Sequence, residues 1–143
     1  MPSARKAEAE WNGNLREGNG HFKVGSGKVS GAYSFPTRFE EAPGTNPEEL
    51  IGAAHASCFS MALSGGLGKS GHNAKRIRTT ANVHLEKVGE GFQITRIELD
   101  TEGEVPGIDE ATFQQHANGA KENCPVSKAL KGVEITLKAR LKK

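Results

Sequence analysis

Two cysteines, Cys58 and Cys124, are the residues of this chain best suited to chemistry, and no C-x-x-C pair joins them. A thiolate is the nucleophilic form of cysteine. Cys124 stands directly before Pro125, where it can cap a short helix whose free N–H groups stabilise a thiolate. Cys58 lies deep within a predicted helix, beyond the first turn in which the helix dipole acts. Each cysteine taken alone can also be interpreted as a small buried hydrophobic residue without a chemical role.

A reactive Cys58 needs a cation from elsewhere in the chain, and Arg38 is the best-placed candidate, although an arginine is more often a solvated residue. Two acids begin the helix that carries Cys58. At about 100° per residue, Glu49 points away from Cys58 and suits a capping role, whereas Glu48 points nearer the cysteine face. Either acid lies about 15 Å from Cys58 along the axis at 1.5 Å per residue. Glu48 therefore either complements the helix dipole or acts at the thiol through Arg38 or from a second subunit.

His55 precedes Cys58 by one helical turn, where it could serve as a base or a ligand. Together with Cys124 this gives three metal ligands without a recognisable finger spacing, so we predict no metal site. The glycines form no phosphate-binding pattern, so we predict no nucleotide and no other cofactor.

The segment Gly44–Leu67 predicts the helix that positions Cys58. Asn46 is a good N-cap, Pro47 suits the first helical position, and the glycines at 65, 66 and 68 supply an expected stop. An apolar stripe of Ile51, Ala54, Cys58 and Met61 is flanked by small residues. Small residues let a second backbone approach closely, so we expect this helix to be central.

The rest of the chain predicts an α+β fold with mainly antiparallel sheet in one domain, residues 1–143. Helices are expected at 110–122, begun by Asp109, and at 125–131. A register break predicts a β-bulge near Thr95 and Arg96. The expected strands are 5–12, 21–24, 33–39, 77–88, 92–105 and the alternating 133–142.

Composition narrows the class of protein. Only 35% of the 143 residues are hydrophobic, which predicts either a thin core or one completed against a second copy. A net charge of +2, spread along the chain, argues against a nucleic-acid partner. We found neither a signal peptide nor a run of 18 apolar residues, so we expect a soluble cytoplasmic protein without a membrane partner.

Several motifs resemble the OsmC/Ohr family, and its OsmC (osmotically inducible protein C) branch in particular. They are T-R-F-E, G-T-N-P-E-E-L-I-G-A-A-H-A-S-C-F-S-M-A-L, V-P-G-I-D and N-C-P-V-S-K-A-L. The resemblance runs from W-N-G at Trp11 to the closing strand. It implies an intertwined homodimer in which antiparallel sheets wrap around two central helices and the active sites lie at the subunit interface.

The resemblance also implies a function, a thiol-dependent peroxidase of oxidative and osmotic stress defence. It would reduce organic hydroperoxides, and hydrogen peroxide less well, through a Cys58 sulfenic acid and a Cys58–Cys124 disulfide. Matching the motifs makes Cys58 the peroxidatic cysteine, Cys124 the resolving cysteine, and Arg38 and Glu48 their catalytic partners. The reductant would be an external dithiol of the lipoyl type. The alternative is a non-catalytic redox sensor or stress-binding protein that uses the same disulfide switch.

Overall fold

The computed structural model describes residues 4–143 and divides the chain into two compact units, with the boundary between Leu50 and Ile51. The first unit holds strands β1 (Ala7–Asn12), β2 (Asn19–Val24) and β3 (Ser30–Tyr33) and the short helix α1 (Phe35–Phe39). Helix α2 (Pro47–Lys69) begins in the first unit. The second unit holds β4 (Arg76–Val88), β5 (Gly91–Glu104), α3 (Glu110–Asn123), α4 (Pro125–Ala129) and β6 (Glu134–Leu141). The fold is mixed α+β, as the sequence predicts, while a single domain over residues 1–143 stays a prediction.

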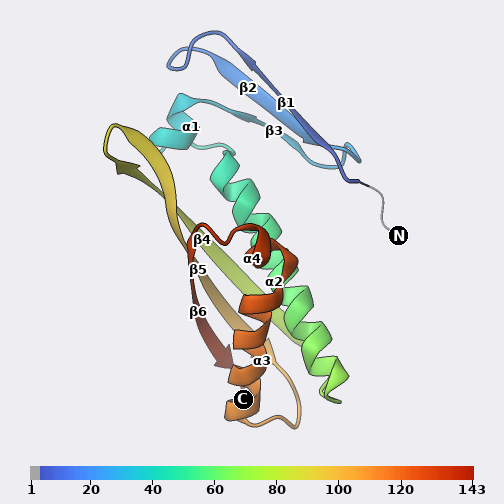
Figure 1. The fold of residues 1–143 in the computed structure, drawn as a ribbon. Helices are drawn as coiled ribbons and strands as arrows, with labels where there is room; N and C mark the ends of the chain where they lie inside the picture. Colours follow the sequence, from blue (N-terminus) through green and yellow to red (C-terminus); the bar gives the residue numbers. More distant parts are fainter. Residues whose placement is uncertain (1–3) are drawn as a thin grey trace. The chain divides into compact units, whose positions relative to one another are not determined.

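Strands β1, β2 and β3 form an antiparallel meander (Figure 1), but the strand predicted at 33–39 is wrong beyond Tyr33. Residues 35–39 form α1 instead, because Ser34 and Thr37 make a reciprocal capping box. The Ser34 side chain accepts from the Thr37 N–H, and the Thr37 hydroxyl oxygen accepts from the Ser34 N–H at 2.9 Å. Phe35 and Phe39 are four residues apart, so their rings meet on one face of α1 at 5.0 Å.

Helix α2 begins as predicted but ends later. The side-chain oxygen Oδ1 of Asn46 accepts from the Glu49 N–H at 2.8 Å, which confirms the N-cap. The predicted stop at Gly65, Gly66 and Gly68 is wrong, since all three lie inside the helix. The chain leaves the helix at Gly71, where φ is +85°, and the His72 N–H donates to the Leu67 carbonyl at 2.9 Å. Glycine permits a left-handed residue without imposing one, and the fully buried Leu67 anchors the last turn in the core.

The second sheet has the order β4-β5-β6. Thr95 is left unpaired between the pairs His84–Arg96 and Leu85–Ile94, so the predicted bulge is confirmed. Strand β6 runs parallel to β5, which corrects the expectation of mainly antiparallel sheet for this pair. The reason is the crossover through α3 and α4, which returns the chain to the end of the sheet where β5 began.

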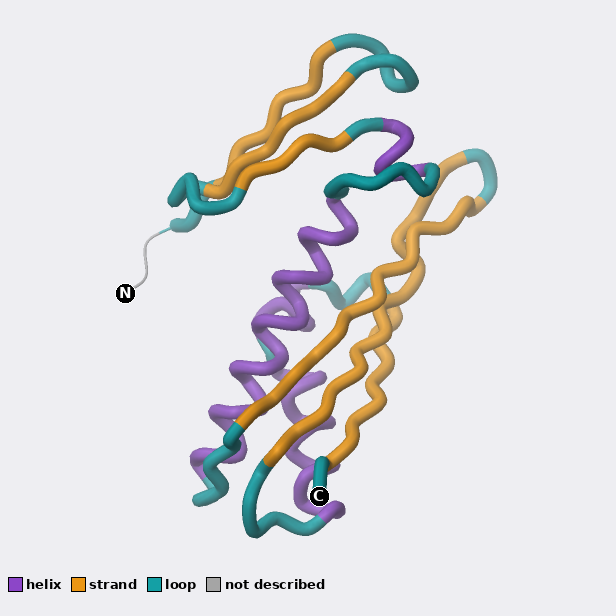
Figure 2. The backbone as a smooth tube through the Cα atoms, turned by 180° about the vertical axis from the view of Figure 1, so that it is seen from behind, coloured by secondary structure: helices purple, strands orange, loops and turns teal. Residues whose placement is uncertain are grey.

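Helices α2 and α3 cover one face of the β4–β5–β6 sheet, as both views show (Figures 1 and 2). Helix α2 packs against β4 at Gly52, where an added Cβ would make van der Waals contact with the Ala81 carbonyl oxygen at 3.4 Å. Fully or nearly fully buried apolar side chains from α2, β5 and α3 fill the space between, namely Phe59, Leu63, Leu67, Ile97, Leu99, Phe113 and Ala117.

The opposite face of α2 is exposed in the single chain. It carries Ala53, Ala54, Ser57 and Met61, and the Met61 side chain is 77% exposed. The stripe predicted from Ala54 and Met61 thus faces away from the core formed by Phe59 and its neighbours. By length and composition α2 would also span a membrane, with a mean hydropathy of 1.3 over its most apolar stretch, of which 28% is buried. That apolar surface needs a covering group.

Candidate functional site

The two thiols meet in the second unit. Cys58 lies in the middle of α2, and Cys124 is the residue between α3 and α4, where Pro125 forces the helix to break. Both cysteines are free, and their side chains are close enough to hydrogen-bond. Cys124 has no exposed surface, whereas Cys58 is only half-buried. Cys58 is therefore the more accessible of the two sulfurs.

The surroundings of the two sulfurs shift their pKa values in opposite directions. Burial raises the pKa of Cys58, and the contact with Cys124 raises it further against a smaller effect of the Val126 N–H. Burial also opposes ionisation of Cys124, but the Cys58 thiol and the N–H and hydroxyl of Ser127 outweigh it and lower the pKa of Cys124. Within the single chain the negative charge of the pair is thus drawn towards Cys124.

A buried carboxylate and an arginine form a second pair in the first unit. The Arg38 Nη2 donates to a Glu48 carboxylate oxygen at 2.9 Å, and Nε lies 3.3 Å from both oxygens. The Glu48 side chain is 10% exposed and that of Arg38 is 36% exposed. Glu49 instead accepts from the Asn46 side chain at 3.3 Å, in keeping with the capping role predicted for it, while a role of Glu48 at the thiol stays a prediction. Such a pairing fixes the plane of a guanidinium and leaves its outer edge for an anion.

An aromatic pocket of about 230 Å³ lies beside Arg38. Its walls are Trp11, Leu15, Tyr33, Phe35 and Phe39. The Trp11 and Tyr33 rings lie 5.5 Å apart, and Gly20 makes room for them, since an added Cβ would lie 2.5 Å from the Tyr33 ring. The Arg38 guanidinium also lies over the Phe39 ring at 5.3 Å. The pocket therefore combines an apolar wall with the Arg38 guanidinium.

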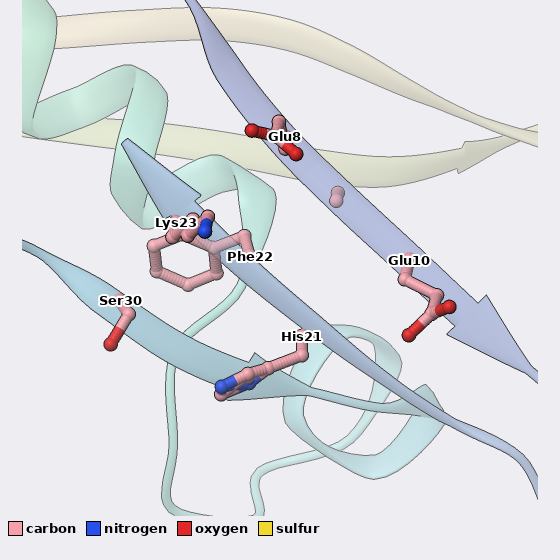
Figure 3. A pocket seen from close by; sticks show the side chains of 7 residues that line it. Glu8, Glu10, His21, Phe22, Lys23 and Ser30 are labelled. Atoms are coloured by element: carbon pink, nitrogen blue, oxygen red, sulfur yellow. The ribbon is translucent and has the colours of Figure 1, made fainter. Parts of the chain in front are cut away.

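A larger hollow of about 580 Å³ lies over β1, β2 and β3, lined by Glu8, Glu10, His21, Lys23 and Ser30 with Ala9 and Phe22 (Figure 3). Its charged side chains are exposed, and none of its residues is a cysteine or an arginine. Both carboxylates come from β1 and the ammonium group from β2, as expected for the solvated face of a small sheet.

His55 forms a buried contact beside the thiols. Its Nε2 lies 2.7 Å from the Ser127 hydroxyl oxygen, and both side chains are almost fully buried. Burial lowers the pKa of His55, so the imidazole is neutral near pH 7. Across residues 4–143 we found no group of three His, Cys, Asp or Glu side chains arranged to hold a metal ion.

With this geometry in hand, comparison with known proteins gives the family. The family model for OsmC-like proteins matches residues 40–138. The chain is also 52% identical to Peroxiredoxin OsmC of Escherichia coli strain K12, over 99% of each chain. The chain belongs to the OsmC family. Among solved structures, an OsmC-family fold is shared with an organic hydroperoxide resistance protein from Elizabethkingia anophelis, with a TM-score of 0.78 and 25% identity over 99% of this chain and 100% of that one. OhrB of Bacillus subtilis aligns with a TM-score of 0.72 and 28% identity, over 96% of this chain and 98% of that one.

The structure joins the sequence-predicted residues of this OsmC-family chain as two pairs, Cys58 with Cys124 and Arg38 with Glu48. Sequence reasoning missed the aromatic pocket, because residues 33–39 were expected to form a strand. It also missed Ser127, whose only signal was its place in the C-P-V-S motif.

Proposed function

We propose that this chain is a thiol-dependent peroxidase for organic hydroperoxides, with Cys58 as the peroxidatic and Cys124 as the resolving cysteine. The observation that carries the proposal is the contact between two free thiols from distant parts of the chain. Such a pair stores the two electrons that a peroxide reduction consumes. The likeness to Peroxiredoxin OsmC and to organic hydroperoxide resistance proteins supports the same chemistry.

Exposure decides which sulfur reacts first. A peroxide can reach the half-buried Cys58. It has no open path to Cys124, because the Cys124 sulfur has no exposed surface. Ionisation alone would favour Cys124, since the contacts within the chain raise the pKa of Cys58. The reaction at Cys58 therefore needs a cation that moves the shared charge onto its sulfur. Arg38, held by Glu48, is our candidate for that cation.

Helix geometry indicates that the cation comes from a second copy of the chain. Glu48 precedes Cys58 by ten residues of α2, about 15 Å along the axis at 1.5 Å per residue. The Arg38 guanidinium is bound to Glu48 and is thereby held near the start of that helix. In a two-fold symmetric dimer, Arg38 of the partner subunit would serve Cys58, and the reverse would hold at the second site.

The exposed face of α2 supports a homodimer. Its small side chains, Ala53, Ala54 and Ser57, let two helix backbones come close, and Met61 adds an adaptable apolar contact. Covering this face with the same face of a second copy also accounts for the length and apolar character of a helix that its own chain leaves largely exposed.

The chemistry then follows in three steps. The Cys58 thiolate attacks the distal peroxide oxygen, the O–O bond breaks, and the alkoxide leaves as an alcohol after taking a proton. Arg38 stabilises the charge that moves onto the leaving oxygen, and Glu48 keeps the guanidinium plane in place. Cys124 condenses with the Cys58 sulfenic acid to a disulfide and water, and an external dithiol reopens that disulfide by exchange.

The aromatic pocket supports a preference for organic hydroperoxides. Trp11, Tyr33, Phe35 and Phe39 offer apolar surface to the organic group of a substrate while Arg38 faces its polar end. Hydrogen peroxide has no such group and gains nothing from this surface. We propose a lipoyl-type dithiol as reductant, a cytoplasmic location and a role in stress defence on the resemblance to the family.

Steady-state consumption of cumene hydroperoxide with a dithiol tests the proposal. We expect continuous turnover of the unaltered protein and no turnover in Cys58→Ser. In a buffer without any thiol, Cys124→Ser should undergo a single oxidation per subunit. A reaction of the unaltered protein that stops after one equivalent in the presence of lipoyl, thioredoxin and glutathione reductants would contradict catalysis and would indicate a redox sensor instead.

A further inference from the structure

His55 is a fully buried imidazole that the proposed reaction does not use. It lies one helical turn before Cys58 on α2, and its Nε2 contacts the Ser127 hydroxyl at 2.7 Å. The other ring nitrogen, Nδ1, is also buried and has no hydrogen-bond partner among residues 4–143. A buried polar atom without a partner destabilises a fold, so a residue that keeps one is expected to bring a compensating function.

The unpartnered nitrogen determines the tautomer. A buried N–H without an acceptor is among the rarest features of protein interiors, whereas an uncovered lone pair is better tolerated. Nδ1 is therefore the unprotonated nitrogen of the neutral ring, and Nε2–H donates to the Ser127 oxygen. With its oxygen occupied as an acceptor, the Ser127 hydroxyl must direct its own proton to another group.

Cys124 is our candidate for that group. Ser127 lies three residues after Cys124, in α4. Its N–H and its hydroxyl lower the pKa of the Cys124 thiol. Cys124 and His55 have no exposed surface and Ser127 is only 4% exposed, so water does not compete with this chain of contacts. Hydrogen bonds in such a dry environment are stronger than in water, and each one polarises the next.

We propose that His55 is a positioning residue for the second half of the reaction, because it holds the Ser127 hydroxyl against Cys124 so that Cys124 attacks as a thiolate. The inference rests on the proposed peroxidase function. In this step the Cys124 sulfur forms a bond to the Cys58 sulfur and the S–O bond of the sulfenic acid breaks. The oxygen leaves with the proton released by Cys124, as water. The Cys124 sulfur is oxidised and the sulfenic sulfur is reduced.

The titration of Cys124 in a Cys58→Ser background tests the inference without turnover. Thiolate absorbance near 240 nm is followed against pH in that protein and after adding His55→Leu, His55→Gln or Ser127→Ala. Losing one hydrogen bond to the thiolate, about 1.4 kcal/mol, cuts its fraction near neutral pH about tenfold, and we expect this in His55→Leu and Ser127→Ala. His55→Gln keeps a donor at a similar position and should retain most of the thiolate.

The controls separate this effect from general disruption. Ser26→Ala removes an exposed hydroxyl in the first unit and should leave the titration unchanged. Cys58, the titratable group in contact with Cys124, is absent from every protein compared. The charged groups around the hollow that Ser127 lines, Lys121, Glu122 and Lys131, stay the same throughout. If His55→Leu does not fold, Ser127→Ala still decides the question.

A kinetic measurement completes the test. Proteins with Cys58 restored are mixed with one equivalent of cumene hydroperoxide, and sulfenic acid and disulfide are followed by quenched-flow mass spectrometry. We expect disulfide formation to slow about tenfold in His55→Leu and its pH profile to move to higher pH, with rescue in His55→Gln. An unchanged titration and an unchanged disulfide rate in Ser127→Ala would overturn the inference. Failure of the unaltered protein to form any sulfenic acid would refute the proposed function, while the titration would still report on Cys124.

Discussion

Separating Arg38 and Cys58 onto different subunits gives the sharpest test of the proposed site. Arg38→Met removes the cation and Cys58→Ser removes the nucleophile. At about 4 Å and an effective dielectric constant of about 20, one unit charge is worth about 4 kcal/mol to a thiolate. Allowing for relaxation at the one-third exposed Arg38, we expect about 2–4 kcal/mol, which lowers the reactive fraction of Cys58 about 30- to 1000-fold. Each homodimer of a single variant should thus be nearly inactive.

A heterodimer of the two variants distinguishes an arginine supplied by the partner from one supplied by the same chain. If the partner supplies it, one site combines both substitutions and the other combines an intact Cys58 with an intact Arg38. A heterodimer purified through two different affinity tags should then show about half of the unaltered activity. If each chain supplies its own arginine, both sites carry one substitution and the heterodimer is inactive.

The assay is cumene hydroperoxide consumption with excess dithiol, with doubly tagged unaltered protein as the reference. Size-exclusion chromatography with light scattering establishes that each preparation is dimeric. An inactive heterodimer beside an active reference would refute the helix argument that places Arg38 near the partner's thiol. A protein that is monomeric at assay concentration would refute it as well.

Four further predictions concern single residues. Glu48→Gln should lower kcat/KM about fivefold to tenfold through a looser guanidinium, whereas the neighbouring Glu49→Gln should affect only stability, as measured by thermal unfolding. Tyr33→Ala should lower kcat/KM for cumene hydroperoxide about tenfold with a much smaller change for hydrogen peroxide, and equal losses would remove the aromatic pocket from the binding site. Phe113→Ala should lower the free energy of unfolding by about 3–5 kcal/mol in urea, since its side chain has no exposed surface. The burial of His55 lowers its pKa below the 6.5 of an unfolded chain, so its contribution to stability is complete above about pH 6.5 and is lost as the pH falls towards the folded-state pKa. Urea unfolding at pH 7.5 and 5.5 should therefore show a free energy of unfolding that depends less on pH in His55→Gln than in the unaltered protein.

Local signals in the sequence predict the start of α2 and the capping role of Glu49 well, but not the residue at which α2 ends. Asn46 and Pro47 specify where α2 begins through short-range hydrogen bonds and a fixed dihedral angle. The angular separation of Glu48 and Glu49 follows from helix geometry alone, and the observed partners agree with it. The bulge at Thr95 is also readable, because a change of parity in the apolar residues requires an extra residue.

The features that sequence reasoning missed depend on alternatives with equal local patterns or on distant contacts. Phe35 and Phe39 have the same parity in a strand and lie one turn apart in a helix, so five residues cannot decide between the two. The parallel pairing of β6 follows from the path of the chain between strands, which the alternating pattern of β6 does not record. The contact of His55 with Ser127 joins residues 72 positions apart and follows only from the packed fold.

One amide, that of Asn46, links the start of α2 to the place where the arginine is held. Its oxygen accepts from the Glu49 N–H at 2.8 Å, and its nitrogen donates to the Thr37 carbonyl at 2.9 Å. Thr37 precedes Arg38, and Glu49 follows Glu48. The Asn46 side chain therefore hydrogen-bonds to the residue next to each member of the ion pair. The Asn46 side chain thus contributes both to the start of α2 and to the position of Arg38, the proposed cation, so a substitution at position 46 is expected to change both properties at once.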